Sequence, residues 1–170
     1  PCMKIVLNGP ECSGKTTLAM ELAERHGVAV APEPARGQMQ PEQRYQPSDL
    51  LALMWQQIRL ERHATAELQI FDTDLQNIYL WWQEKFGPAP TLLQRRYAEY
   101  CSQQDRIYLL CRPDIRWEFD PLRENPHDRD RLYALYCADL AARGLAYGVI
   151  EGQRNQRLKS ALAYLQRRGV

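Results

Sequence analysis

Short apolar runs recur along the chain and alternate with longer stretches in which apolar residues return every three or four positions. The first three runs end at a glycine, a proline and an aspartate, as buried strands commonly do. Strands that alternate with helices form parallel sheets covered on both faces. The pattern therefore predicts a three-layer α/β fold with a five-stranded parallel sheet, its strands near residues 4–8, 28–31, 67–71, 106–110 and 146–150.

The helical stretches have recognisable ends. The first is expected to start at Thr16 and to stop before Gly27, and Ser48 is expected to cap a helix that continues to Ile58. A proline- and glutamine-rich loop separates them, and no internal repeat interrupts the chain, so residues 1–170 are expected to form one domain. Further helices are expected up to residue 86, over 91–101, and through 132–136 and 158–165.

Composition narrows the class of protein. The chain has a hydrophobic fraction of 45% and a charged fraction of 25%, which are ordinary values for a globular protein. Its formal net charge of +1 gives no overall attraction to nucleic acid or to an anionic membrane. Its 5 cysteines contain no Cys-x-x-Cys spacing, and no apolar run is long enough to span a bilayer. We therefore expect a cytoplasmic protein without nucleic-acid or membrane partners.

The first predicted strand runs into a glycine-rich loop that opens the first helix. Gly9 and Gly14 lie at the spacing that lets backbone N–H groups surround phosphate oxygens at a helix N-terminus. Lys15 is placed to reach the outer phosphates, and the Thr16 hydroxyl to bind Mg²⁺. The loop predicts ATP and Mg²⁺ as cofactors, held by Gly9, Glu11, Cys12, Ser13, Gly14, Lys15, Thr16 and Thr17.

Acidic residues follow the second and third predicted strands, where ligands of open parallel sheets bind. Asp72 is expected to anchor Mg²⁺ together with Thr16. Asp74 could serve the same site or substrate, or could simply cap the next helix. Glu33 is the first candidate for the base that accepts the proton of a hydroxyl acceptor, with Asp72 second. The alternative for Glu33 is a solvated carboxylate or a partner of Arg36.

Residues 112–131 combine arginines, aspartates and prolines and follow the fourth predicted strand. Arginines on a closing lid stabilise charge on a migrating phosphoryl group, so this segment is expected to be a lid. Arg123 is expected to act on the transferred group and Arg116 on ATP. The alternative is a solvated loop of mixed charge, in which each ion pair contributes little.

Aromatic residues offer flat faces for a base or a pyridinium ring. Trp81 and Trp82 are adjacent on a predicted helix, so at most one of them faces the substrate, and Trp81 is our candidate. Aromatic residues at helical spacing are more often part of the core. Beyond the fifth strand, the turn that ends at Arg154 could pack against adenine or be an ordinary loop.

Taken in order, these motifs resemble a known family. The chain is similar to the ribosylnicotinamide kinase domain of the bifunctional bacterial NAD-salvage regulator, and to the wider set of AAA-type ATPase and kinase domains. The resemblance covers nearly the whole chain and rests on ordered pieces: Gly9–Leu18, Glu33–Arg36, Asp72–Asp74 with Trp81, Phe86-Gly87, Pro113-Asp114 with Trp117, Asp120, Leu122-Arg123, Arg129 and Glu151-Gly152.

The resemblance implies a nucleoside kinase that transfers phosphate from ATP to the 5′-hydroxyl of nicotinamide riboside, giving nicotinamide mononucleotide. It also implies that Arg36 and Asp120 join Glu33, Asp72, Asp74 and Trp81 around the substrate. Glu33-Pro34 looks like the Glu-Pro pair of deoxynucleoside kinases, in which the glutamate is the base. Two alternatives stay open, a kinase of another nucleoside or small alcohol, and an ATP-binding switch whose loop over 37–48 meets a partner.

Overall fold

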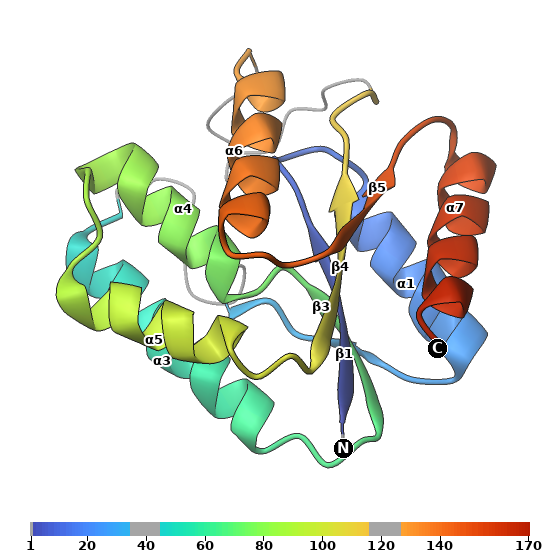
Figure 1. Ribbon diagram of the computed structural model, residues 1–170, viewed down its shortest axis with the longest axis horizontal. Coiled ribbons are helices and arrows are strands. Elements are labelled where there is room, and N and C mark those ends of the chain that lie inside the picture. The colour runs from blue at the N-terminus through green and yellow to red at the C-terminus, as the bar shows by residue number, and fades with distance from the viewer. Residues whose placement is uncertain (1, 35–44, 116–126) are drawn as a thin grey trace.

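The computed structural model describes residues 2–34, 45–115 and 127–170. Its centre is one sheet of five strands, all parallel, in the order β2-β3-β1-β4-β5. The sheet confirms the predicted α/β class, and its first strand lies in the middle (Figure 1). The strands are β1 (Met3–Asn8), β2 (Val30–Ala31), β3 (Leu68–Asp72), β4 (Arg106–Cys111) and β5 (Tyr147–Ile150).

Helices cover both faces of the sheet, as Figure 1 shows. Side chains alternate between the faces of a strand, so Ile5 and Leu7 of β1 contact one layer of helices and Val6 contacts the other. Helices α1 (Lys15–His26) and α7 (Arg154–Arg167) lie on the first side. On the second lie α4 (Leu75–Phe86) and α6 (Arg129–Ala142), with α3 (Pro47–Arg62) and α5 (Thr91–Cys101) packed against α4.

Two predicted boundaries differ from the structure. The second strand is shorter than predicted, because Gly27 turns with a φ of 66° and the Val28 amide donates to the Ala23 carbonyl at 3.0 Å. That bond ends α1 and keeps Val28 out of the ladder. Helix α3 is capped by Gln46 in a reciprocal capping box, so the predicted cap at Ser48 was wrong. Pro47 occupies the first helical position, where its missing N–H costs nothing.

A buried polar cluster lies behind the carboxyl end of β3. Asp74 caps α4 by accepting from the Gln76 amide at 3.0 Å, and its side chain is fully enclosed. The same carboxylate accepts from the Asn8 side chain at 3.0 Å and from the Tyr108 hydroxyl at 2.8 Å. It therefore joins β1, β4 and α4 by hydrogen bonds that burial makes costly to break.

Within this cluster Arg106 forms ion pairs with Glu61 at 3.1 Å and with Asp74 at 3.4 Å. Burial is the largest influence on Glu61 and raises its pKa above the usual value of 4.5. The folded protein thus holds the Glu61 proton more tightly than the unfolded chain does. The free energy of unfolding gained from that proton is complete below pH 4.5 and is lost as the pH rises through the folded pKa.

Replacing Glu61 with glutamine removes this titration, which gives a testable result. The wild-type free energy of unfolding, relative to that of Glu61→Gln, should decrease as the pH rises above 4.5 and then level off. Urea unfolding at a series of pH values measures the difference, with exposed Glu99→Gln as the matched control. Parallel curves for the wild type and Glu61→Gln at every pH would contradict it.

Among the described residues, no helix is both long enough and apolar enough to cross a membrane.

Candidate active site

The turn between β1 and α1 has a backbone that requires glycine at two points. Gly9 has a φ of 141°, and a Cβ there would lie 2.5 Å from the Cys111 carbonyl oxygen of β4. Gly14 has a φ of 80° and precedes the first residue of α1. Both positions favour glycine over any residue with a side chain, which lets the turn pass close to β4. The loop therefore has the strand–turn–helix context that the sequence predicts for phosphate binding.

Three side chains of this loop and of the start of α1 are held by hydrogen bonds, two to carbonyls of the loop itself and one to the end of β3. Lys15 donates to the Gly9 carbonyl at 2.8 Å, so its amine crosses the mouth of the loop. Ser13 is buried and donates to the Pro10 carbonyl at 2.7 Å. Thr16 donates to an Asp72 oxygen at 2.5 Å, which joins the start of α1 to the end of β3.

Thr16 and Asp72 fit the requirements of a Mg²⁺ site. Within the described part of the chain, the second carboxylate oxygen of Asp72, Oδ1, is buried without a hydrogen-bond partner. A buried carboxylate oxygen is costly to leave unpaired, and Mg²⁺ prefers hard oxygen ligands such as carboxylate and hydroxyl. The predicted pair is thus brought together, with one oxygen available to a cation or to its bound water.

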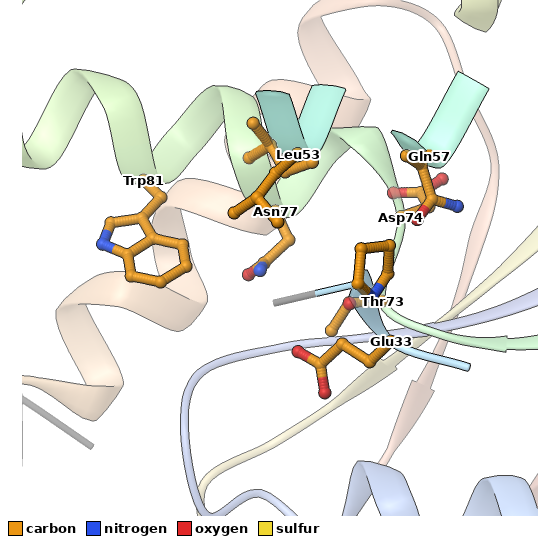
Figure 2. Close-up of a pocket in the computed structure, with 9 residues that line it drawn as sticks. Glu33, Leu53, Gln57, Thr73, Asp74, Asn77 and Trp81 are labelled. Carbon is orange, nitrogen blue, oxygen red and sulfur yellow. The ribbon is translucent and has the colours of Figure 1, made fainter. Parts of the chain in front are cut away.

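A pocket opens next to this pair, beyond the ends of β2 and β3. Asp72 faces the phosphate loop, and the next two residues of the chain, Thr73 and Asp74, line the pocket. Figure 2 shows the Glu33 carboxylate, the Asn77 amide and the Trp81 indole arranged around the same open space. The complete lining is Glu33, Pro34, Leu53, Gln57, Thr73, Asp74, Asn77, Ile78 and Trp81. Of the predicted substrate residues, Glu33, Asp74 and Trp81 therefore lie at one pocket.

Two features of this pocket reduce the stability of the folded protein. Thr73 has a φ of 73°, a left-handed conformation that is unfavourable for a β-branched residue. Gln57 is buried, and its side-chain nitrogen has no hydrogen-bond partner within the described residues. Strain and unpaired polar groups are common where a ligand binds, so both features support this pocket as a candidate binding site.

The sequence left two possible roles for Asp74, binding Mg²⁺ or substrate and capping the next helix, and the structure favours capping. Its carboxylate accepts five hydrogen bonds, from Asn8, Gln76, Tyr100, Arg106 and Tyr108, and none of its side chain is exposed. With those acceptor sites used inside the protein, the expectation that Asp74 binds Mg²⁺ or substrate loses its physical basis. Its contribution to the pocket is the shape of the wall.

Trp81 lies at one side of the pocket beside two further side chains. Its ring meets Tyr45 edge-on with centroids 4.1 Å apart. The Lys85 amine lies 5.7 Å from the Trp81 ring centroid and 5.3 Å from that of Tyr45. This arrangement gives the pocket an aromatic wall with a cation already associated with it.

The predicted arginines fall into distinct groups. Arg112 and Arg131, at the ends of the predicted lid, pair with Glu151 at 2.6 Å and with Glu84 at 2.7 Å. Both are about half exposed, so these pairs have the character of surface ion pairs. Arg154 pairs with Glu21 of α1 and is largely exposed. Arg36, Arg116, Asp120 and Arg123 lie outside the described residues.

Several residues at the site had no local signal in the sequence. Arg129, one of the arginines of the predicted lid, donates to the Cys12 carbonyl of the phosphate loop at 2.9 Å, a contact that the sequence did not predict. Arg157 donates to the Ser13 carbonyl at 2.7 Å from a helix more than a hundred residues away in the chain. Gln57 and Asn77 sit on predicted helices among other polar residues, where nothing distinguished them.

Comparison with known proteins places the chain in a family. The sequence matches an AAA domain family over residues 4–157, which is most of the chain. Among proteins with curated functions, none matches this sequence. Several solved structures are similar in fold. Deoxyadenosine kinase from M. mycoides with bound dCTP has a TM-score of 0.66 at 14% identity, covering 96% of this chain and 99% of that one.

Two further structures have similar coverage. Thymidylate kinase from Ehrlichia chaffeensis has a TM-score of 0.64 at 16% identity, covering 98% of this chain and 100% of that one. The YorR protein from Bacillus subtilis, in complex with phosphorylated GDP, has a TM-score of 0.60 at 14% identity, covering 97% and 96%. The chain therefore belongs to the AAA domain family, and it has the fold of the P-loop nucleoside and nucleotide kinases.

Proposed function

We propose that this protein is an ATP- and Mg²⁺-dependent kinase that phosphorylates the 5′-hydroxyl of a nucleoside, with nicotinamide riboside as the leading acceptor. One observation carries the proposal. The Thr16–Asp72 pair at the phosphate loop and the Glu33 pocket share the carboxyl edge of the sheet, joined through Asp72 and Thr73. A phosphoryl donor and a hydroxyl acceptor need such adjacent sites for direct transfer. Two of the structures with a similar fold are a deoxyadenosine kinase and a thymidylate kinase, which supports the same class of reaction.

On the donor side, the loop backbone and Lys15 bind the phosphates. Gly9 and Gly14 allow the turn, and the N-terminus of α1 adds its positive dipole end. Lys15, now on the Gly9 carbonyl, exchanges that partner for a phosphate oxygen when the nucleotide enters. Thr16 and Asp72 would hold Mg²⁺, which would supply positive charge to neutralise the phosphate oxygens.

On the acceptor side, Glu33 accepts the proton of the attacking hydroxyl. Its carboxylate lies at the pocket, where it is half-buried just after β2 (Figure 2). A carboxylate that receives this proton raises the nucleophilicity of the hydroxyl as it approaches the phosphoryl group. Asp72 is already bonded to Thr16, which favours Glu33 over Asp72 for this role.

The pocket suits a ring that bears an amide or a similar polar edge. The Gln57 nitrogen needs an acceptor, and the Trp81 indole supplies a flat apolar face. The carboxamide of nicotinamide riboside offers such an acceptor, which supports it together with the motif resemblance. The position of Lys85 near Trp81 favours a neutral ring, and therefore a kinase of another nucleoside is the second candidate.

Replacing Asp72 with asparagine tests the donor side. Asparagine keeps the size of the side chain and one oxygen but removes the charge that attracts Mg²⁺. We expect the Mg²⁺ concentration for half-maximal activity to rise by about 10-fold or more, a loss of roughly 1.4 kcal/mol in binding. Activity titrated with Mg²⁺ at fixed ATP gives the value. An unchanged Mg²⁺ requirement would remove Asp72 from the metal site.

Stimulation of ATP consumption by an acceptor tests the kinase against the switch. A kinase consumes ATP faster when its hydroxyl acceptor is added, and ADP then forms in step with a phosphorylated product. A switch shows a slow basal rate that small acceptors leave unchanged. The proposal fails if nicotinamide riboside and a panel of ribo- and deoxyribonucleosides all leave ATP consumption at the basal rate.

A further inference from the structure

Arg157 is a buried charged residue that the proposed mechanism does not yet use. It lies on α7, is 5% exposed, and reaches across to the phosphate loop between β1 and α1. A buried guanidinium needs several hydrogen-bond acceptors to offset the loss of water. The identity of those acceptors shows what the residue holds in place.

The acceptors come from three separate segments that meet at the edge of the sheet. The Arg157 Nη1 atom donates to the Ser13 carbonyl at 2.7 Å, and Nη2 donates to the Arg112 carbonyl at 2.8 Å. Nε donates to the Gly152 carbonyl at 2.9 Å, and Nη2 also pairs with the Asp114 carboxylate. One planar group thus ties the phosphate loop to the segment after β4 and to the turn after β5.

Asp114 adds a second connection between the same segments. Its other carboxylate oxygen accepts from the Gly152 amide at 2.7 Å. Gly152 has a φ of 90°, so the turn after β5 depends on a backbone that glycine adopts most readily. Arg157, Asp114 and Gly152 therefore form a closed set of hydrogen bonds behind the phosphate loop.

The bond to Ser13 has a direct consequence for the loop. A peptide unit is planar and trans, so its carbonyl and the following N–H point in opposite directions. Holding the Ser13 carbonyl on Arg157 therefore directs the Gly14 N–H away from Arg157. Gly14 itself lies close by, since a Cβ there would be 3.3 Å from the Arg157 Nη1 atom. The orientation of this donor is therefore set from outside the loop.

We propose that Arg157 is a positioning residue for nucleotide binding, which orients the Ser13–Gly14 peptide so that the Gly14 N–H meets a phosphate oxygen. The inference rests on the proposed function to the extent that the loop binds ATP. It adds that the loop is not self-sufficient: its geometry depends on α7 and on Asp114. A planar fork serves this role better than a point charge, because three carbonyl oxygens must be met at once.

ATP affinity, measured by equilibrium binding in the absence of any acceptor, tests the role. Arg157→Gln should weaken ATP binding by about 10- to 100-fold, the range for losing hydrogen bonds made by a charged group. Arg157→Lys keeps the charge but loses the fork, and should still bind ATP several-fold more weakly than the wild type. Asp114→Asn, which leaves Arg157 in place but removes its carboxylate partner, should show a smaller loss.

Lys159→Gln is the matched control, since it makes the same charge change at an exposed position of the same helix. It should bind ATP as the wild type does. Thermal unfolding of every variant identifies a temperature at which all of them are folded, and ATP binding is measured at that temperature. If Arg157 only stabilised the fold, the folded variants would bind ATP as tightly as the wild type. If Arg157→Gln does not fold, Arg157→Lys and Asp114→Asn give the answer.

The positioning role is overturned if the folded Arg157 variants bind ATP within twofold of the wild type, or if the wild type itself does not bind ATP. Failure of the proposed kinase activity looks different. In that case the wild type binds ATP and Arg157→Gln binds it more weakly, but no acceptor is phosphorylated.

Discussion

Lys15→Ala is expected to reduce ATP-dependent phosphorylation by about 100- to 1000-fold, the range for removing one preorganised donor from a charged transition state. Lys15 reaches back across the loop to the Gly9 carbonyl, so its amine already lies where the phosphates would enter. Removing it leaves the developing negative charge without the ammonium group of the phosphate loop. Initial rates at saturating ATP and acceptor measure the effect.

The fold should survive this change, because Lys15 lies at the first position of α1 and alanine is a strong helix former. Lys159→Ala, at an exposed position of α7, is the matched control and should keep the wild-type rate. Thermal unfolding of both variants should remain close to that of the wild type. A Lys15→Ala protein that turns over at more than a tenth of the wild-type rate would exclude Lys15 from catalysis.

Glu33→Gln is expected to lower kcat by about 100- to 10,000-fold, the usual contribution of a positioned general base. Glutamine has the same shape as glutamate and can accept a hydrogen bond, but it does not take up the proton of the acceptor hydroxyl at neutral pH. Because Glu33 lies in the acceptor pocket and Lys15 and Thr16 lie at the phosphate loop, ATP affinity should stay within about twofold of the wild type.

Separate measurement of kcat and of the dissociation constant for ATP distinguishes this role from general damage to the site. Glu99→Gln makes the same substitution on the exposed surface of α5 and should change neither quantity. If Glu33→Gln retained the wild-type kcat, the proton would have to leave by another group, and Asp72 would become the candidate. A parallel loss of ATP affinity would instead indicate a structural role for Glu33.

The parts of the site that could be predicted from sequence depend on residues that lie close together along the chain. Gly9, Gly14, Lys15 and Thr16 fall within eight residues, and their spacing carries the geometry of the loop between strand and helix. Asp72 follows an apolar run, and the parallel sheet brings the end of that run beside β1. Both the fold class and the Thr16–Asp72 contact follow from these short-range signals.

The parts that sequence did not reveal depend on contacts between distant segments. Arg157 reaches Ser13 from α7, and Gln57 enters the pocket from α3. On its own helix each looks like an ordinary polar residue, and only packing shows that it is buried. The cap that Asp74 forms with Gln76 is local and was one of the two predicted alternatives, but its enclosure depends on distant donors, Asn8, Tyr100 and Tyr108.

The errors at the start of α3 and in the length of β2 had local causes. Ser48 has the higher intrinsic preference for a cap, but Gln46 with Asp49 three residues on forms a reciprocal pair and Pro47 between them fixes the first turn. In the second strand the apolar character of Val28 suggested a longer run. The hydrogen bond from Val28 to Ala23 instead completes the end of α1.

Mass spectrometry of the product formed from nicotinamide riboside, ATP and Mg²⁺ tests whether the protein is the proposed kinase. We expect a product heavier than the acceptor by one phosphoryl group, formed in step with ADP and absent with Lys15→Ala. Phosphorylation of another nucleoside in the same panel would keep the kinase and change its acceptor. If the protein binds ATP but neither nicotinamide riboside nor any ribo- or deoxyribonucleoside gains a phosphate, the proposed function is contradicted.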